Sequence, residues 1–409
     1  MKALRNIVDK LKPTFSKGGK LGFLHSTFDA FETFLFVPNT TTQHGAHVRD
    51  CNDIKRTMIT VVVALVPALL FGCYNTGLQV GLEGLTAFAY GLVRILPMIA
   101  VSYIVGLGIE FTVAQWRGHE VNEGFLVSGF LIPLVMPIST PLWMVGLGTA
   151  FAVIFGKEIF GGTGMNIFNP AVLARAFVFF AYTPQMSGEK VWYPTNSGMW
   201  SQVGEWFGAT DATTGATALE RATEGVAGLE QVVNNGNVIE SNDFVLNSFL
   251  GFIPGSFGET STVAILIGAV ILLVSGVASW KTMVSVFVGG LAMAYAFSFS
   301  TIGALSNPEV NGVAVEGIEP YMHLLIGGFA FGAVFMATDP VTSAQTSAGK
   351  YIVGFMTGAI AILIREINPA YPEGMMLSIL FMNALTPLVD YFVVEANIRR
   401  RKNRVKIAK

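Results

Sequence analysis

The sequence predicts an all-α, polytopic membrane protein with about ten transmembrane helices arranged in two five-helix halves. Three observations lead to this fold class. Only 13% of the 409 residues are charged and 52% are hydrophobic, whereas soluble domains carry roughly 25% charged residues. Runs such as 58–74 and 282–300 hold almost no charge and can cross a hydrocarbon layer of about 30 Å. A polar insert, 184–246, divides the apolar chain into two parts.

Ten spans are expected, five before the insert and five after it. The third, fourth and fifth are short, which indicates tilted, broken or half-length helices, and Pro97 favours a kink in the second. An odd number of spans in each half would invert the second half relative to the first, as in inverted-repeat transporters. The expected spans are 57–75, 86–114, 124–137, 141–156, 170–183, 261–279, 282–300, 321–338, 350–365 and 375–395.

The distribution of Lys and Arg predicts the orientation of the chain. Nine of these residues lie in 1–56 and seven in 396–409, whereas the loop 301–320 has three Glu and no basic residue. Because basic loops stay in the cytoplasm, we expect both termini inside and the acidic insert outside. The expected regions are an N-terminal segment (1–56), a first transmembrane half (57–183), an extracytoplasmic insert (184–246), a second transmembrane half (247–395) and a basic tail (396–409).

Cysteine and histidine usage argues against several cofactors. The two cysteines, Cys51 and Cys73, are too few for a disulfide framework or an iron–sulfur cluster within this chain. Of the five histidines, only His323 borders an expected span, so haem and a tightly bound metal are poor candidates. Electron transfer would therefore need an organic cofactor, and no nucleic-acid partner is expected.

Two Gly- and Pro-rich stretches interrupt helices at membrane depth. They are GGTGMNIFNP (161–170) and ATDPVTSAQTSAG (337–349), and NPAV (169–172) at the end of the first faintly resembles DPVT (339–342) in the second. Irregular backbone is tolerated there only where protein or a water-filled cavity covers it, so both stretches are expected to form sites. Near the N-terminus, FDAFETFLFV (28–37) is amphipathic. It fits a helix lying on the cytoplasmic leaflet and equally a short helix packed on the bundle.

The insert contains the segment DATTGATAL, which begins at Asp211. Asp, Thr and Gly favour turns, and the segment would suit a loop that caps the following helix. It also resembles the D-x-x-[ST]-G-A-T flavinylation motif, to whose last Thr a Mg-dependent flavin transferase attaches FMN through its phosphate. A Thr hydroxyl is a weak nucleophile, so the attaching enzyme would have to activate it. The residues that match the motif are Asp211, Thr214, Gly215, Ala216 and Thr217.

The resemblance to a known family extends over nearly the whole chain. Six segments resemble the B-type subunits of the sodium-translocating NADH:quinone oxidoreductases. The family implies a six-chain complex of the bacterial inner membrane, with five other subunits and a flavin transferase as partners. It also implies covalent FMN, bound riboflavin, ubiquinone reduction and Na⁺ export. The segments are HVRDCNDIKR (47–56), HEVNEGF (119–125), KEIFGGTG (157–164), NPAVLARAF (169–177), GGFAFGAVFMATDPV (327–341) and NPAYPEGMM (368–376).

Two apolar ligands have candidate sites. Asn amides suit the pyrimidine edge of a flavin and glycines permit close backbone approach, although a broken helix packed on itself would show the same pattern. For quinone we expect an apolar site near the cytoplasmic face, beside the Phe-rich N-terminal segment. The riboflavin candidates are Gly161, Gly162, Gly164, Asn166 and Asn169, and the quinone candidates are Gly106, Gly108 and Phe125.

Three acidic residues within spans are candidates for a sodium path: Glu110, Asp339 and Asp390. An intramembrane carboxylate costs about 2.5–3.5 kcal/mol on insertion scales, and such residues usually have a function. Each acid could instead cap a broken helix or pair with an Arg. Glu158 and Glu366 follow basic residues directly, and we expect them to be charges at the membrane interface.

Two other functions fit parts of the sequence. The equivalent subunit of an Rnf-type ferredoxin:NAD⁺ complex shares the motif and the core, but the long basic N-terminal segment favours the NADH:quinone reductase. A channel or transporter of the inverted-repeat class would use the broken helices without electron chemistry, and it would carry no flavin.

Overall fold

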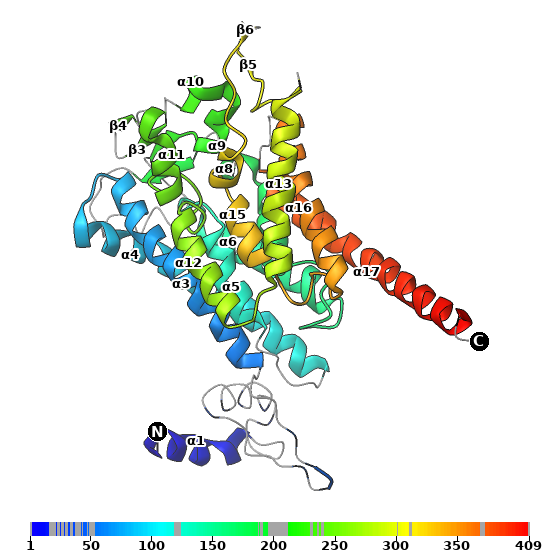
Figure 1. The fold of residues 1–409 in the computed structure, drawn as a ribbon. Helices are drawn as coiled ribbons and strands as arrows, with labels where there is room; N and C mark the ends of the chain where they lie inside the picture. Colours follow the sequence, from blue (N-terminus) through cyan, green and yellow to red (C-terminus); the bar gives the residue numbers. More distant parts are fainter. Residues whose placement is uncertain are drawn as a thin grey trace.

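The computed structural model describes a bundle of helices (Figure 1), which confirms the all-α polytopic class. Within the described part of the chain, five helices are long and apolar enough to cross a membrane. These are α3 (Ile54–Gln79), α4 (Gly84–Arg117), α13 (Trp280–Ser298), α16 (Ser347–Ile367) and α17 (Gly374–Ile407). The described residues are 2–15, isolated positions between 22 and 48, 54–117, 124–186, 188, 191–194, 212–229, 232–234, 237–238, 241–300, 302–310, 313–368 and 373–407.

The other expected spans contain shorter helices. The third to fifth are short, as predicted, and the sixth is short as well. The eighth is broken, because Ile326 is extended and Gly327 adopts φ 67°, a left-handed backbone conformation that favours glycine. The shorter elements are α5 (Phe125–Leu134), α6 (Leu142–Val153) with the π-helical turn η2 (Ile154–Glu158), α7 (Pro170–Ala181), α12 (Thr262–Val274), α14 (Met322–Leu325), α15 (Phe329–Phe331) and the π-helical turn η7 (Gly332–Met336).

Two local sequence features recur in the two halves of the chain. The third element of each half is short and ends beside a Met, at Met136 after α5 and at Met336 in η7. The fifth elements, α7 and α17, both follow the start of the tripeptide Asn-Pro-Ala, at 169–171 and 368–370. NPAV and DPVT, which resemble each other faintly, occupy different places in the two halves: NPAV precedes the fifth element of its half, and DPVT follows the third.

Glycines allow the long helices to approach each other closely. A Cβ at Gly358 of α16 would overlap the backbone of Val286 in α13, and a Cβ at Gly91 of α4 would overlap that of Cys73 in α3. Lipid is as apolar as the side chains, so association inside a membrane depends largely on such van der Waals contact. These positions hold each half together without any polar group.

The insert folds into small elements with a core of their own, gathered at one end of the bundle (Figure 1). Leu219 and Phe244 of the insert are buried there together with Ile253, Leu305 and Ile318 from the second half. The insert is therefore anchored on the bundle. Its elements are α8 (Thr183–Met186), the antiparallel pair β1 (Val191–Pro194) and β2 (Ala212–Gly215), α9 (Ala218–Arg221), the 3₁₀ turn η6 (Ala222–Glu224), α10 (Gly225–Leu229), the pair β3 (Val233–Asn234) and β4 (Asn237–Val238), and α11 (Ser241–Leu250); the pair β5 (Glu309–Val310) and β6 (Val313–Ala314) lies beside them.

The N-terminal helix α1 (Lys2–Phe15) lies at the opposite end from the insert (Figure 1). The ring of Phe15 stacks on Phe28 at 4.9 Å, and Lys12 Nζ lies 2.8 Å from a carboxylate oxygen of Glu32. These contacts favour packing within the segment, although most of the amphipathic stretch 28–37 lies outside the described residues.

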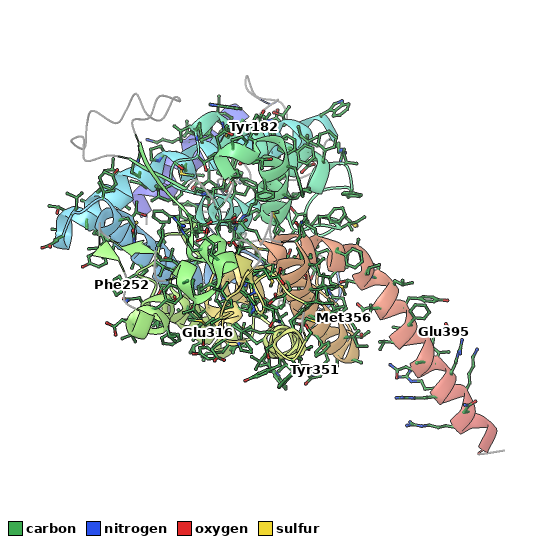
Figure 2. All side chains as sticks on the ribbon, turned by 90° about the horizontal axis from the view of Figure 1, so that it is seen from above. Tyr182, Phe252, Glu316, Tyr351, Met356 and Glu395 are labelled. Atoms are coloured by element: carbon green, nitrogen blue, oxygen red, sulfur yellow. The ribbon has the colours of Figure 1, made fainter. Side chains whose placement is uncertain are left out.

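Helix α17 projects well beyond the bundle (Figure 2). It continues without interruption from the apolar span to Ile407. The basic tail expected at 396–409 therefore continues the helix of the last expected span as far as Ile407.

Candidate functional site

Thr217 stands at the N-terminus of α9, where its Oγ1 accepts a hydrogen bond from Glu220 N (3.3 Å). Its own N–H donates to the carbonyl of Gly188 (2.8 Å). A Cβ at Gly188 would lie only 2.9 Å from Thr217 Oγ1, so a glycine there leaves room beside the hydroxyl. Thr217 therefore caps the following helix, as one interpretation of the motif predicts. In the cap its Oγ1 acts only as an acceptor, so the hydroxyl group remains able to react.

The rest of the motif is only partly visible. Thr214 and Gly215 belong to β2, which pairs with β1 so that Trp192 faces Thr214 in the register. Ala216 is half-buried, and Asp211 lies outside the described residues. The strand pair and the cap hold the two ends of the segment Thr214–Thr217.

Beside Thr217 lies a space of about 510 Å³, which we call the insert cleft. Gly328 is necessary to its shape, since a Cβ there would lie 2.5 Å from Glu259 Oε1. The residues that line it include Thr217, Gly255, Glu259, Thr260, Gly328 and Glu373.

Arg175 of α7 forms the charged floor of this region. Its guanidinium donates to Glu259 Oε1 (2.5 Å) and to Glu373 Oε2 (2.7 Å), so one cation from the first half binds two carboxylates from the second. Burial raises the pKa of the Glu259 carboxyl, and the positive charge of Arg175 opposes that rise. A further space of about 380 Å³ adjoins the insert cleft, shares Glu259, Gly328 and Glu373 with it, and reaches Met336 of η7.

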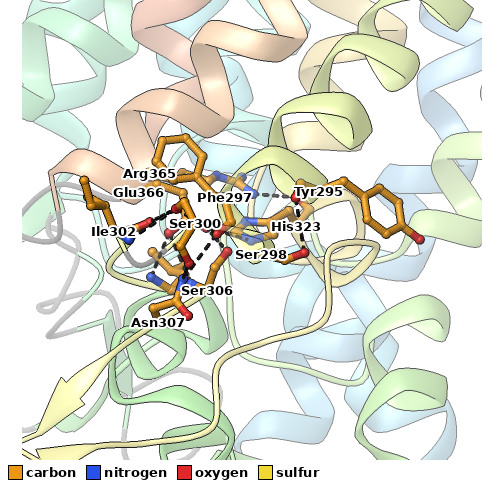
Figure 3. Close-up of polar contacts among 11 residues, drawn as sticks. Tyr295, Phe297, Ser298, Ser300, Ile302, Ser306, Asn307, His323, Arg365 and Glu366 are labelled. Atoms are coloured by element: carbon orange, nitrogen blue, oxygen red, sulfur yellow. Dashed lines mark hydrogen bonds and ion pairs between the residues drawn. The ribbon is translucent and has the colours of Figure 1, made fainter.

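A second buried polar network supports the break between α14 and α15 (Figure 3). Arg365 donates to the carbonyls of His323 (2.6 Å) and Ile326 (3.2 Å), which the broken helix leaves without helical partners. Glu366 accepts from Leu305 N (3.0 Å) and from Ser306 Oγ (2.5 Å), and it lies 3.1 Å from His323 Nε2. Glu366 is only 2% exposed. The expectation that it is an interfacial charge is wrong, because the loop after α13 folds over it.

The two broken stretches meet at the other end of the bundle. They line a space of about 770 Å³, the break cleft, together with the start of α3 and with α12. Residues from both stretches face this space, as the sequence predicts for site-forming elements. The lining includes Lys157, Thr163, Asn166, Asn169, Phe335 and Asp339.

Asn169 and Asp339 connect the two halves inside the break cleft. Asn169 caps α7 through Oδ1, which accepts from Ala171 N (3.0 Å), and its Nδ2 donates to Asp339 Oδ2 (3.3 Å). Asp339 also accepts from Val341 N and from Thr342 Oγ1, both at 3.1 Å. Asn169 thus caps α7 and Asp339 stabilises the turn after η7, while both side chains line the cleft.

The predicted riboflavin residues separate into two groups. Asn166 and Asn169 line the break cleft. Gly161, Gly162 and Gly164 are not among its lining residues; they adopt φ of 120°, 98° and 89°, which other residues rarely do. These glycines shape the backbone turn that presents the two Asn side chains.

Glu110 forms a buried ion pair with Lys157. Lys157 and Glu158 belong to the π-helical turn η2, and Glu158 lies 3.9 Å from Arg117. Glu158 is 6% exposed, so it is not an interfacial charge; the π turn directs it into the protein. Lys157 also lines the break cleft. Glu110 therefore contacts a residue of the cleft but does not itself line it.

Asp390 lies away from both clefts and joins α17 to the start of α16. Its carboxylate accepts from Gln345 N (2.7 Å), Thr346 N (3.1 Å) and Thr346 Oγ1 (2.5 Å). These contacts agree with the alternative to a role in the sodium path, in which the carboxylate of Asp390 caps a broken helix.

Of the three predicted quinone residues, only Gly106 and Phe125 lie in contact with each other. The ring of Phe125 is buried, packs edge-on against Tyr103 and occupies the space that a side chain at Gly106 would need. Gly108 has open space beside it, and a Cβ there would meet nothing within 4 Å. Gly106 and Phe125 thus form one contact, while Gly108 faces outward from α4.

Sequence reasoning missed the Arg175 cluster. Arg175 lies inside an expected span. Because basic residues within spans are rare and need partners, this position could have identified Arg175 as part of a buried polar site. Its partner Glu259 lies in a loop without a motif and Glu373 lies in the segment NPAYPEGMM, and nothing local to either residue indicates the pairing.

Comparison with known proteins shows the family. The NQR2, RnfD, RnfE family matches residues 41–399. A protein of Chromohalobacter salexigens is 44% identical over 98% of this chain and 96% of its own length, and one of Stutzerimonas stutzeri is 43% identical over 97% and 98%. Both are named as the B-type subunit of a Na(+)-translocating NADH-quinone reductase, as is a protein of Pseudomonas aeruginosa at 42% identity. The chain therefore belongs to the NQR2, RnfD, RnfE family.

Proposed function

We propose that this chain is the flavin-bearing membrane subunit of a respiratory complex that couples electron transfer from NADH to ubiquinone with Na⁺ export. The names of its relatives supply the complex and the reaction. The single observation that carries the flavin is the position of Thr217, whose hydroxyl lies beside the insert cleft at one end of the bundle. Without the chains that bind the nicotinamide, the subunit does not oxidise NADH alone.

Thr217 carries FMN through a phosphodiester that a flavin transferase forms. The small residues Gly188 and Ala216 beside the hydroxyl leave space for the active site of that enzyme. The bound group supplies reversible electron transfer, and the chain holds it at the end of the bundle where the insert folds. The insert then faces outward and both termini lie in the cytoplasm of a bacterium, since the basic residues gather in the terminal segments.

Riboflavin occupies the break cleft. Asn166 and Asn169 supply amide groups that match the donors and acceptors of a flavin pyrimidine edge, and both residues line this cleft. The ring contacts Thr163 and Phe335, which line the same space.

Sodium passes close to Glu110, Asp339 and Asp390, whose oxygens are the ligands that hard cations prefer. Moving one charge against the membrane potential costs about 2.3 kcal/mol per 100 mV, which a downhill electron step of similar voltage can supply. Quinone is reduced beside Gly106, Gly108 and Phe125, at the end of the bundle opposite the insert.

The test of the flavin is direct. The chain is co-expressed with the flavin transferase and viewed under ultraviolet light on a denaturing gel. We expect fluorescence on this band, its loss in Thr217→Ala, and its retention in Thr223→Ala, a matched change in the same segment. Mass spectrometry of the Thr217 peptide should show an FMN-sized adduct. If the wild-type band does not fluoresce, the remaining candidate function is that of a channel or transporter without redox chemistry.

The sodium path needs a separate measurement in the whole complex. We expect Asp390→Ala to shift the Na⁺ dependence of quinone reduction to higher concentration. Unchanged sodium affinity and pumping would remove Asp390 from the path, with no bearing on the flavin.

A further inference from the structure

We propose that a pocket between the starts of α13 and α16 binds the headgroup of an anionic phospholipid. We call it the basic pocket, because Lys281 and Lys350 line it. It lies at the end of the bundle opposite the insert, where the two helices begin side by side (Figure 1). The proposal does not depend on the flavin at Thr217. The polar residues that line the pocket include Ser279, Lys281, Ser343, Gln345, Ser347 and Lys350.

The two helices run parallel and start at the same level. Lys281 Nζ donates to Ser347 Oγ (2.9 Å), and one turn further along Ser285 Oγ donates to the carbonyl of Tyr351 (2.6 Å). The first-turn N–H groups of a helix give its N-terminus a partial positive charge. The basic pocket therefore combines two helix N-termini with two ammonium groups.

The lysines of the basic pocket have no carboxylate partner. Among the ion pairs of the described residues, none involves Lys281 or Lys350. The carboxylate of Asp390 binds Gln345 N and Thr346 instead. Riboflavin, which we propose for the adjoining break cleft, is uncharged and leaves this positive charge unneutralised. The pocket is therefore suited to an anion that comes from outside the chain.

A buried hydroxyl of the basic pocket is also without a partner. Ser343 is 8% exposed and lines the pocket. Its N–H and its carbonyl are both hydrogen-bonded, but within the described part of the chain its Oγ makes no hydrogen bond. A phosphate oxygen accepts from hydroxyl and ammonium groups alike. The pocket holds about 210 Å³ of water-accessible space, many times the roughly 10–15 Å³ that one water molecule needs, so a phosphate group fits.

The surroundings of the basic pocket favour a lipid as the source of the phosphate. Trp280 and Tyr351 pack edge-on at 6.1 Å beside it, and these residue types gather at the membrane–water interface. Val284 and Val288 follow Trp280 at intervals of four residues and are exposed, as is Phe355 four residues after Tyr351. An apolar strip thus leads from the pocket along both helices, where acyl chains can lie. Basic pockets between transmembrane helices are typical sites for anionic lipid headgroups.

The proposal is tested on the purified complex with a phosphatidylglycerol probe whose acyl chain carries a photoreactive diazirine. After illumination, peptide mapping should find the label on 284–288 of α13 or 352–356 of α16. Lys281→Gln/Lys350→Gln should raise the probe concentration for half-maximal labelling roughly thirtyfold, as expected for the loss of two basic contacts to an anionic lipid.

Three further variants serve as controls. Lys281→Arg/Lys350→Arg keeps both charges and should keep the labelling. Arg400→Gln/Lys402→Gln removes two charges from the projecting part of α17 and should leave the label on α13 and α16 unchanged. Ser343→Ala removes only the hydroxyl and should raise the half-maximal concentration about fivefold, the value of one hydrogen bond. It supplies the decisive measurement if the lysine variant does not assemble.

Three results would overturn the proposal. Equal labelling by a phosphatidylcholine probe with the same acyl chain would show that this face contacts any lipid. Competition by inorganic phosphate as effective as that by unlabelled phosphatidylglycerol would show a site for a free anion. An absence of label from both stretches in the wild-type complex would show that another chain covers this face.

Discussion

The insert cleft and the break cleft both lie between the two halves, but opposite kinds of contact join the halves at each. At the insert cleft, Arg175 of the first half binds Glu259 and Glu373 of the second. At the break cleft the corresponding cation, Lys157, is paired with Glu110 within its own half. The cross-half contacts there are hydrogen bonds of Asn169. The insert end of the interface is therefore held by buried charge, and the other end by weaker bonds.

This difference indicates which end can open. Separating a buried ion pair leaves uncompensated charge in a low-dielectric region, which costs several kcal/mol. Separating Asn169 from Asp339 costs one hydrogen bond to a charged group, about 1.5–3 kcal/mol. We therefore expect rearrangement of the halves to begin at the break cleft.

The largest effect should come from Arg175→Met. This change leaves Glu259 and Glu373 buried without their cation, and breaking such a pair costs about 3–5 kcal/mol. Thermal unfolding of the detergent-solubilised complex should move to a clearly lower temperature. The double variant Arg175→Met/Glu259→Gln should recover part of the loss, and an equal loss in both variants would show that the charge pairing is not what stabilises this end.

Gly328→Val should have the next largest effect. The new side chain would collide with Glu259, whose Oε1 lies 2.5 Å from the position of the Cβ, and overpacking of this kind costs about 1–3 kcal/mol. The same unfolding measurement should show a moderate decrease. Gly108→Ala is the control, since nothing lies within 4 Å of a Cβ there. If the two variants unfold alike, Gly328 is not a steric requirement.

Asp339→Asn tests the weaker end. The variant loses charge-assisted bonds to Asn169 and Thr342 but retains an oxygen for Val341 N, so the free energy of unfolding should decrease by about 1 kcal/mol. Hydrogen exchange at the start of α7 should quicken more than exchange in α13. Exchange that quickens equally in both helices would contradict a local opening at the break cleft.

The smallest effect should follow Arg399→Ala on the projecting part of α17. Arg399 pairs with Glu395 at 2.7 Å, and the Arg side chain is 73% exposed. Exposed pairs of this type contribute about 0.2–1 kcal/mol, so the unfolding temperature should hardly change. A large decrease would mean that this part of α17 is packed against another chain of the complex.

The sequence allowed the architecture to be predicted because hydropathy and helix breaks are local properties. The runs 58–74 and 282–300 are spans because nearly every residue in them is uncharged and most are apolar, and the broken stretches 161–170 and 337–349 are marked by their own Gly and Pro. Asn166, Asn169 and Asp339 were identified from those stretches, and they line one cleft.

Pairings between distant residues could not be predicted in this way. Arg175 meets Glu259 and Glu373 across 84 and 198 residues of sequence. Glu366 resembles an interfacial charge when only its neighbours in the sequence are considered, and it is buried because Leu305 and Ser306 fold over it. Such contacts depend on how the two halves and their loops pack, which a single sequence does not specify.

The π-helical turn η7 separates the two clefts with adjacent side chains: Phe335 faces the break cleft, and Met336 faces the space that adjoins the insert cleft. A π turn contains one residue more than an α turn, and one residue corresponds to about 100° of helical rotation. Tightening this turn would therefore swing both side chains about the helix axis together. A change in this single irregular turn can therefore alter the lining of both spaces at once, without moving any whole helix.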